Sequence, residues 1–149
     1  MNINLSIQED DDKGIDFENY SLEEEIKKYE GFEPVNFHIT LRMYVEPVEI
    51  QTKGGILLTG TRITKDHDDK KFRNRVGLVV QFGKGVYEDE TRYDLCGPLC
   101  KIGDWILIPR AEGHSTFYDN MTTLIIREDR VLGKVKDPRK IKLIKANDY

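Results

Sequence analysis

Two cysteines are the first residues in this chain whose type and spacing could support chemistry. Cys96 and Cys100 are spaced C-x3-C, so a disulfide is sterically conceivable, although in a reducing cytosol both would stay thiols. A zinc site needs about four ligands, usually C-x2-C pairs with further Cys or His at set distances. The histidines available to complete such a set are scattered: His38, His67 and His114. We therefore predict no metal site and two small, buried or half-buried cysteines.

Two acidic clusters also contain residues able to bind metal or transfer protons. Residues 66–69 read Asp-His-Asp-Asp and lie among lysines. Consecutive residues of one loop rarely converge on a single ion, so this stretch predicts a solvated loop. Glu88, Asp89 and Glu90 are adjacent in a turn-like segment, which does not place them across a cleft.

The remaining candidates for catalysis lack the arrangement that catalysis requires. His114 and Ser115 are neighbours in the chain, and neighbours do not make a catalytic triad. Residues 83–85 read Gly-Lys-Gly, without the spacing or the terminal Lys-Ser/Thr of a phosphate-binding loop. We therefore expect a protein that is not an enzyme and has no cofactor.

The bulk properties exclude several classes of partner. The chain has 149 residues and a formal net charge of -4, whereas nucleic acids and anionic membranes call for a basic surface. It contains no apolar run of about 18 residues. The N-terminus has no basic and apolar regions of the signal-peptide kind. We expect a cytoplasmic protein.

The N-terminal third predicts a polar extension with one short helix. Residues 1–20 are acidic and include the run Glu9–Asp12, which is typical of a solvated tail. Residues 21–24 form a capping-box pattern that predicts a helix through about Tyr29. Leu22, Ile26 and Tyr29 recur at helical spacing, so one face of this helix could dock on a barrel.

From residue 37 onward the pattern is that of short strands. Apolar and polar residues alternate strictly over residues 37–45, which predicts a half-buried strand with His38 facing outward. Further strands are predicted over residues 76–82, 104–109, 122–127, 131–136 and 140–145. Frequent glycines separate them, and this arrangement predicts an all-β fold, a small barrel or sandwich.

Residues 54–60 carry the most informative pattern in the chain. They place Ile56, Leu57 and Leu58 between glycines, and alone such a triplet would predict a short strand. A long charged stretch follows it, so the triplet fits better as a hydrophobic contact site on a flexible, solvated arm.

The segment reads Gly-Gly-Ile-Leu-Leu-Thr-Gly, and it resembles the Gly-Gly-Ile-Val-Leu-Thr-Gly mobile loop of GroES-type co-chaperonins (the chaperonin-10 family). Residues 76–85 are similar to the strand before the roof hairpin of that family, and residues 101–108 to its Lys-Val-Gly-Asp-x-Val strand. Residues 124–135 are similar to its closing strands. Gly97-Pro98-Leu99-Cys100 resembles divergent, phage-encoded members.

The resemblance covers residues 36–136 and implies a domain division. Residues 1–35 would be an acidic extension with a short helix, residues 36–136 a GroES-like barrel with a mobile loop over about 50–75, and residues 137–149 a tail. The extension, the tail and the long charged loop after Gly60 depart from the minimal family.

The resemblance also implies a function. Seven subunits would form a ring in which the first and last strands of neighbours pair, and the ring would cap a GroEL-type chaperonin in a nucleotide-dependent way, around an unfolded client. The chaperonin would be contacted by Ile56, Leu57 and Leu58. The turns of the loop would come from Gly54, Gly55, Thr59 and Gly60, and the acidic roof from Glu88, Asp89 and Glu90.

Two alternatives use the same barrel. A structural adaptor or virion component would form stable assemblies without a chaperonin, and the two extensions suit that role. Zinc-dependent alcohol dehydrogenases also contain a GroES-like barrel. They need a nucleotide-binding domain and Cys/His ligands, and neither is recognisable in this chain.

Overall fold

The structure is a computed structural model that describes Asp12, residues 14–45 and residues 76–142. Its elements are α2 (Leu22–Lys27), β1 (His38–Met43), β2 (Val76–Phe82), β3 (Trp105–Leu107), β4 (His114–Tyr118), β5 (Met121–Arg127), β6 (Gly133–Val135) and a 3₁₀ helix over Pro138–Lys140. None of the helices in the described part of the chain is long and apolar enough to cross a membrane.

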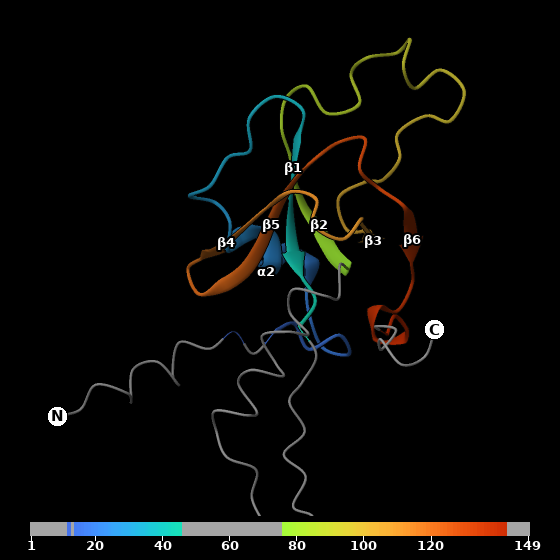
Figure 1. Ribbon diagram of the computed structural model, residues 1–149. Coiled ribbons are helices and arrows are strands. Elements are labelled where there is room, and N and C mark those ends of the chain that lie inside the picture. The colour runs from blue at the N-terminus through green and yellow to red at the C-terminus, as the bar shows by residue number, and fades with distance from the viewer. Residues whose placement is uncertain (1–11, 13, 46–75, 143–149) are drawn as a thin grey trace, which may run out of the picture.

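The six strands form one antiparallel sheet in the order β4-β5-β1-β2-β3-β6 (Figure 1). This confirms the predicted small all-β fold with one short helix. The central strand β1 pairs with β5 on one side and with β2 on the other. Over His38–Met43 it therefore has no free edge for the pairing with a neighbouring subunit that the resemblance implies.

Strand β1 is buried on both faces, so the prediction of a half-buried strand is wrong. Ile39 and Leu41 point to one apolar cluster, and both are fully buried. Thr40 and Arg42 point to the other face and are also buried. His38, which was predicted to face outward, is half-buried. The alternating pattern is present, but the segment that covers the polar face lies elsewhere in the chain.

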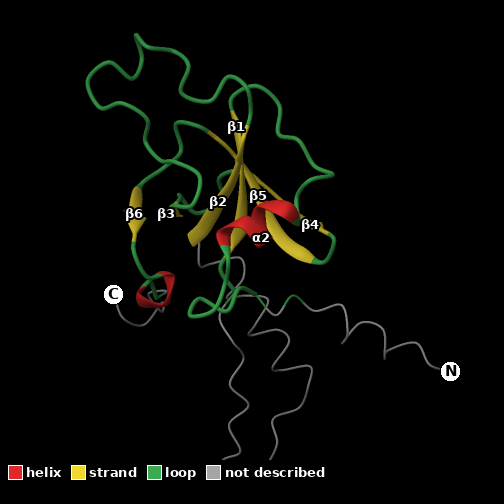
Figure 2. Ribbon diagram, turned by 180° about the vertical axis from the view of Figure 1, so that it is seen from behind, coloured by secondary structure: helices red, strands yellow, loops and turns green. Residues whose placement is uncertain are grey.

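That covering segment is the N-terminal extension. Figure 2 shows α2 lying across one face of the sheet, which we call the helix face. The helix-face cluster of buried apolar residues combines both parts of the chain: Ile15, Tyr29, Tyr44, Val76, Leu78, Val80, Trp105 and Met121. The prediction of a solvated tail over residues 1–20 is therefore wrong for Asp12 and Ile15, which are buried.

Helix α2 forms where the sequence predicts it, over Leu22–Lys27. Ser21 precedes it without a side-chain capping hydrogen bond. Leu22 and Ile26 pack against the helix-face cluster, which Tyr29 joins as a member. This confirms that one face of the helix docks on the sheet. A helix of six residues is too short to be stable alone, so the docking must hold it.

A β-bulge in β2 places a side chain that binds the segment after the helix. Gln81 is the partner of Thr40, whereas Leu41 is opposite Val79, so β2 has one extra residue there. The Gln81 side-chain amide donates hydrogen bonds to the carbonyl oxygens of Tyr29 (2.9 Å) and Phe32 (2.7 Å). The bulge thus satisfies two backbone acceptors of the extension.

Three segments differ from the prediction. Strand β4 was not expected. It joins β5 through the two-residue turn Asp119-Asn120, in which both residues have positive φ (47° and 62°). In the predicted strand over residues 140–145, Lys140 belongs instead to the 3₁₀ helix that Pro138 begins, and residues 143–149 lie outside the described part. Residues 83–104, where a roof hairpin was expected, contain turns and no strand.

Candidate functional site

The predicted binding triplet and its glycines, Gly54 to Gly60, lie outside the described residues, but the strands that flank them are described. Strand β1 leads through Tyr44 to Val45, and β2 begins at Val76. The Tyr44 amide donates a hydrogen bond to the Val76 carbonyl oxygen (2.9 Å). Both ends of the connection over residues 46–75 therefore leave from adjacent positions on the sheet. Tyr44, Val45 and Val76 are buried.

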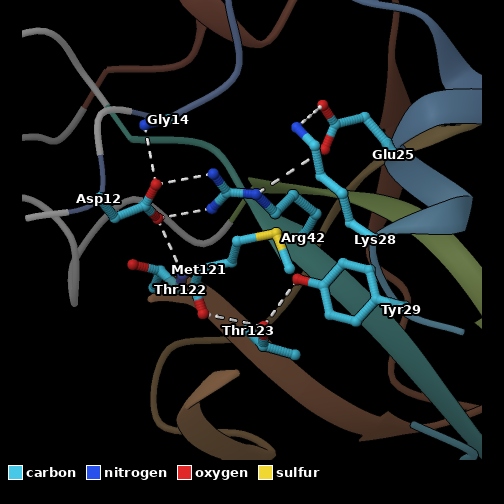
Figure 3. Close-up of polar contacts among 9 residues, drawn as sticks. All are labelled: Asp12, Gly14, Glu25, Lys28, Tyr29, Arg42, Met121, Thr122 and Thr123. Atoms are coloured by element: carbon cyan, nitrogen blue, oxygen red, sulfur yellow. Dashed lines mark hydrogen bonds and ion pairs between the residues drawn. The ribbon is translucent and has the colours of Figure 1, made fainter. Parts of the chain in front are cut away.

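An ion pair lies beside these strand ends. The two Asp12 carboxylate oxygens accept hydrogen bonds from Arg42 Nη1 (2.5 Å) and Nη2 (2.6 Å). Figure 3 shows the carboxylate facing the guanidinium, with two backbone amides on its other sides. These amides belong to Gly14 and Thr122, each 2.8 Å from the carboxylate. Such a bidentate, charge-assisted pair is among the strongest polar contacts in proteins.

The surroundings shift the pKa values of both partners. Burial alone would raise the pKa of Asp12, but the hydrogen bonds and charge of Arg42, with the amides of Thr122 and Gly14, outweigh it and lower that pKa to about 2. Burial opposes the charge of Arg42 too, but the hydrogen bond and charge of Asp12 outweigh it and raise the pKa of Arg42. Both side chains are therefore charged inside the fold at neutral pH.

Helix α2 contributes a second carboxylate to the ion pair. Glu25 is buried, and its Oε2 lies 4.0 Å from Arg42 Nε. Its Oε1 accepts a hydrogen bond from Lys28 Nζ (2.9 Å). Nearby, the Tyr29 hydroxyl and Thr123 Oγ1 are hydrogen-bonded at 2.7 Å (Figure 3). Helix α2 is thus tied to β1 by charge, and Tyr29, just after the helix, is tied to β5 by a buried hydroxyl pair.

The acidic triplet predicted for the roof lies on the loop after β2. Glu88, Asp89 and Glu90 are all exposed, and the Asp89 carboxylate accepts a hydrogen bond from the Arg92 amide (3.2 Å). Arg92 also forms an ion pair with Asp129 (2.6 Å), beyond the end of β5. The structure therefore places the triplet on the surface.

The loop that carries the triplet is anchored by Tyr87 and Glu128. The Tyr87 amide donates to the Glu128 carboxylate, and the Tyr87 hydroxyl donates to the Glu128 carbonyl oxygen (2.7 Å). The same hydroxyl lies 3.4 Å from Cys100 Sγ. Burial raises the pKa of both Tyr87 and the Cys100 thiol, so neither group is ionised at neutral pH.

The other residues considered for chemistry remain apart. Cys96 and Cys100 are both free thiols, but Cys96 is exposed, which corrects the prediction that both would be covered. His114 and Ser115 are exposed on β4, which places them on an edge strand of the sheet. Across the described ranges, no group of three His, Cys, Asp or Glu side chains is arranged to hold a metal ion.

The sequence reasoning missed the ion pair of Asp12 with Arg42. Asp12 ends an acidic run, and its partner is 30 residues away. The only available signal was an arginine on the polar side of an otherwise buried strand. A charged residue there needs an oppositely charged partner when another segment buries that side of the strand.

Comparison with known proteins places this fold in a family. Residues 32–135 match the sequence profile of Cpn10, the chaperonin 10 Kd subunit. The chain belongs to the Cpn10 family. The match begins within the N-terminal segment, after α2, and ends with the last residue of β6.

Similar Cpn10 proteins have been described in bacteria. The co-chaperonin GroES of Caulobacter vibrioides (strain NA1000 / CB15N) is 30% identical over 105 residues, which are 70% of this chain and 97% of that protein. The co-chaperonin GroES of Gemmatimonas aurantiaca is 31% identical over 96 residues, 63% of this chain and 88% of that protein. These relationships support a co-chaperonin role, and Cpn10 is not an enzyme family.

Proposed function

We propose that this Cpn10 chain forms a heptameric ring that caps a GroEL-type chaperonin in a nucleotide-dependent way and encloses an unfolded client. The observation that carries the proposal is the family match, because residues 32–135 include the mobile-loop motif. The binding residues are Ile56, Leu57 and Leu58. Gly54, Gly55, Thr59 and Gly60 supply the turns that present them.

The energetics of one loop favour a multivalent ring. Burying three aliphatic side chains contributes about 5–9 kcal/mol, at roughly 1.5–3 each. Ordering some ten residues of backbone costs about 1–2 kcal/mol per residue. A single loop therefore binds weakly at best. Several loops on one ring bind by avidity and can release together when the nucleotide state of the chaperonin changes.

We propose that neighbouring subunits meet through β6 and the residues that precede β1. Strand β6 is hydrogen-bonded only to β3 in the described sheet, so one of its edges is open to another chain. Val35, Phe37 and Leu132 are large apolar side chains that are 65%, 49% and 65% exposed. Leu132 lies next to the open edge of β6, and exposed apolar groups of this kind are typical of a subunit contact.

Three further assignments complete the proposal. Residues 36–136 form the barrel unit, residues 1–35 an extension and residues 137–149 a tail. The exposed triplet Glu88–Glu90 lies in the roof of the ring. The ring acts in the cytoplasm together with its chaperonin.

The test is native mass spectrometry of the chain, alone and with a bacterial GroEL-type chaperonin, with and without ATP. We expect a ring that joins the chaperonin only with nucleotide. Leu57→Glu should abolish the complex and leave the ring intact, because a charge cannot enter an apolar groove without a large desolvation cost.

Leu95→Glu is the matched control for this substitution. Leu95 is fully exposed on the loop after β2, so the same change there should leave chaperonin binding unaltered. If Leu57→Glu still binds, the loop assignment is wrong. A ring that ignores the chaperonin altogether would favour a structural adaptor or virion component built on the same barrel.

A further inference from the structure

The two described parts of the chain outside the family match contact each other. From the tail, Arg139 Nη1 forms an ion pair with Glu18 Oε1 of the extension (3.0 Å), and its guanidinium lies 4.9 Å from the centre of the Phe17 ring. Pro138 is buried, and Ile141 packs against the helix-face cluster. The extension and the tail therefore cover the same face of the sheet as one unit.

Asp12 connects two strands of that sheet. Its carboxylate binds Arg42, the residue before the last of β1, and the amide of Thr122, the second residue of β5. Leu41 and Leu124 pair these strands nearby. Asp12 thus bridges β1 and β5 at the end of the sheet where β1 leads into the connection over residues 46–75.

The backbone beside Asp12 touches the end of β1 directly. Gly14 has a φ of +78°, and a Cβ added to it would lie 3.0 Å from the Val45 carbonyl oxygen and 3.1 Å from Val45 Cβ. Glycine is required here because the left-handed backbone and the close approach both exclude a side chain. The extension is therefore in van der Waals contact with the last described residue before the connection.

We propose that Asp12, residues 14–31 and residues 136–142 act as one clasp, with Asp12 as the positioning residue that holds the end of β1 from which the chaperonin-binding connection leaves. This inference rests on the proposed capping function and adds a role for the segments outside the family match. A connection with fixed ends has fewer conformations to lose on binding, so less of the binding free energy is spent on ordering.

The first test is amide hydrogen exchange on the full chain with Asp12→Asn. The matched control is Asp16→Asn, the same change on an exposed residue of the same segment, whose carboxylate accepts only local hydrogen bonds. Two amides report on the two ends of the β1–β2 pair: Tyr44, which donates to Val76, and Gly83, which donates to His38.

We expect Asp12→Asn to accelerate exchange at Tyr44 by about tenfold or more relative to Gly83, because local opening exposes only the end that the clasp holds. Asp16→Asn should leave the ratio of the two rates unchanged. A ratio that stays at the wild-type value in Asp12→Asn would overturn the clasp. If Asp12→Asn does not fold, Asp12→Glu takes its place, because it keeps the charge on a longer side chain. Asp12→Glu should change the ratio of the two exchange rates in the same direction by a smaller factor. An unchanged ratio in Asp12→Glu would overturn the clasp.

The second test measures chaperonin binding in the presence of ATP. Asp12→Asn should form the same ring and bind about tenfold more weakly, as expected when additional residues must be ordered. A wild-type chain that binds no chaperonin would refute the capping function, while the exchange ratio would still decide on the clasp. Unchanged binding with a changed exchange ratio would show that the clasp holds the strand ends without serving the partner, and would overturn the functional part of the proposal.

Discussion

The sequence around Asp12 does not reveal the environment of its side chain. It ends the run Glu9–Asp12, yet its side chain is only 3% exposed. Local composition predicts a solvated tail for all four acids, because the information that distinguishes Asp12 lies in Arg42 and Thr122, 30 and 110 residues away. Buried ion pairs of this long-range kind cannot be predicted from local composition.

The ion pair predicts how stability depends on acidic pH. The pKa of Asp12 is lowered from 3.8 to about 2 by folding, so the carboxylate stabilises the native state fully above pH 4. This contribution, about 2 kcal/mol for a shift of this size, is lost progressively as the pH falls from about 4 to 2. Urea unfolding at several pH values should show this loss in the wild type.

The control for this prediction is Asp12→Asn, which has no carboxylate to titrate. Its free energy of unfolding should be lower than that of the wild type at neutral pH, and its decline between pH 4 and 2 should be shallower by the same 2 kcal/mol or so. Parallel pH profiles for the two proteins would contradict the assignment of this acid dependence to Asp12.

At the scale of elements, strands with an apolar run or an apolar face were predictable, and the largely exposed strand β4 was not. The prediction for residues 76–82 matches β2 to the residue, because an apolar run ends at Gly83. Strand β4 reads His-Ser-Thr-Phe-Tyr and is largely exposed, so no apolar face marks it. The Asp-Asn pair that follows was a usable signal, since two-residue hairpin turns favour residues that tolerate positive φ.

This hairpin provides a test of the β4–β5 turn. Asn120 has a φ of 62°, a conformation that costs β-branched residues about 1–2 kcal/mol. Asn120→Val should lower the free energy of unfolding by about that amount, whereas Asn120→Gly should leave it equal or slightly higher. Denaturant unfolding of the two variants measures both effects. Equal stability of both variants would show that the turn does not hold this conformation in solution.

The burial of β1 on both faces shows a second limit of prediction at this scale. An alternating strand indicates which side faces the main core, but it does not reveal whether another segment covers the polar side. Here α2 supplies that cover, and its docking face was predictable from the spacing of Leu22, Ile26 and Tyr29. The sheet face on which α2 docks was not predictable, because no sequence pattern links the helix to that face of the sheet.

At the scale of the whole molecule, the proposed ring contact can be tested apart from the proposed chaperonin contact. Leu132 is 65% exposed next to β6, and we place it at the subunit contact. Leu132→Asp should shift the ring towards monomers, because a charge buried at an apolar interface costs several kcal/mol. Native mass spectrometry at several concentrations measures this shift.

The matched control is again on the loop after β2. Leu95→Asp introduces the same charge on a fully exposed residue and should leave the ring intact. A ring that survives Leu132→Asp at low concentration would move the subunit contact away from β6. The triplet Ile56–Leu58 lies outside the described residues, so at this scale its role stays a prediction from the motif.

The bridge from Asp12 to Thr122 also has a consequence for synthesis of the chain. Asp12 is made 110 residues before Thr122, a delay on the order of ten seconds at translation rates of about 5–20 residues per second. Throughout that time Asp12 has no Thr122 amide to bind. Docking of Asp12 on the sheet therefore has to wait until β5, which receives it, has been made.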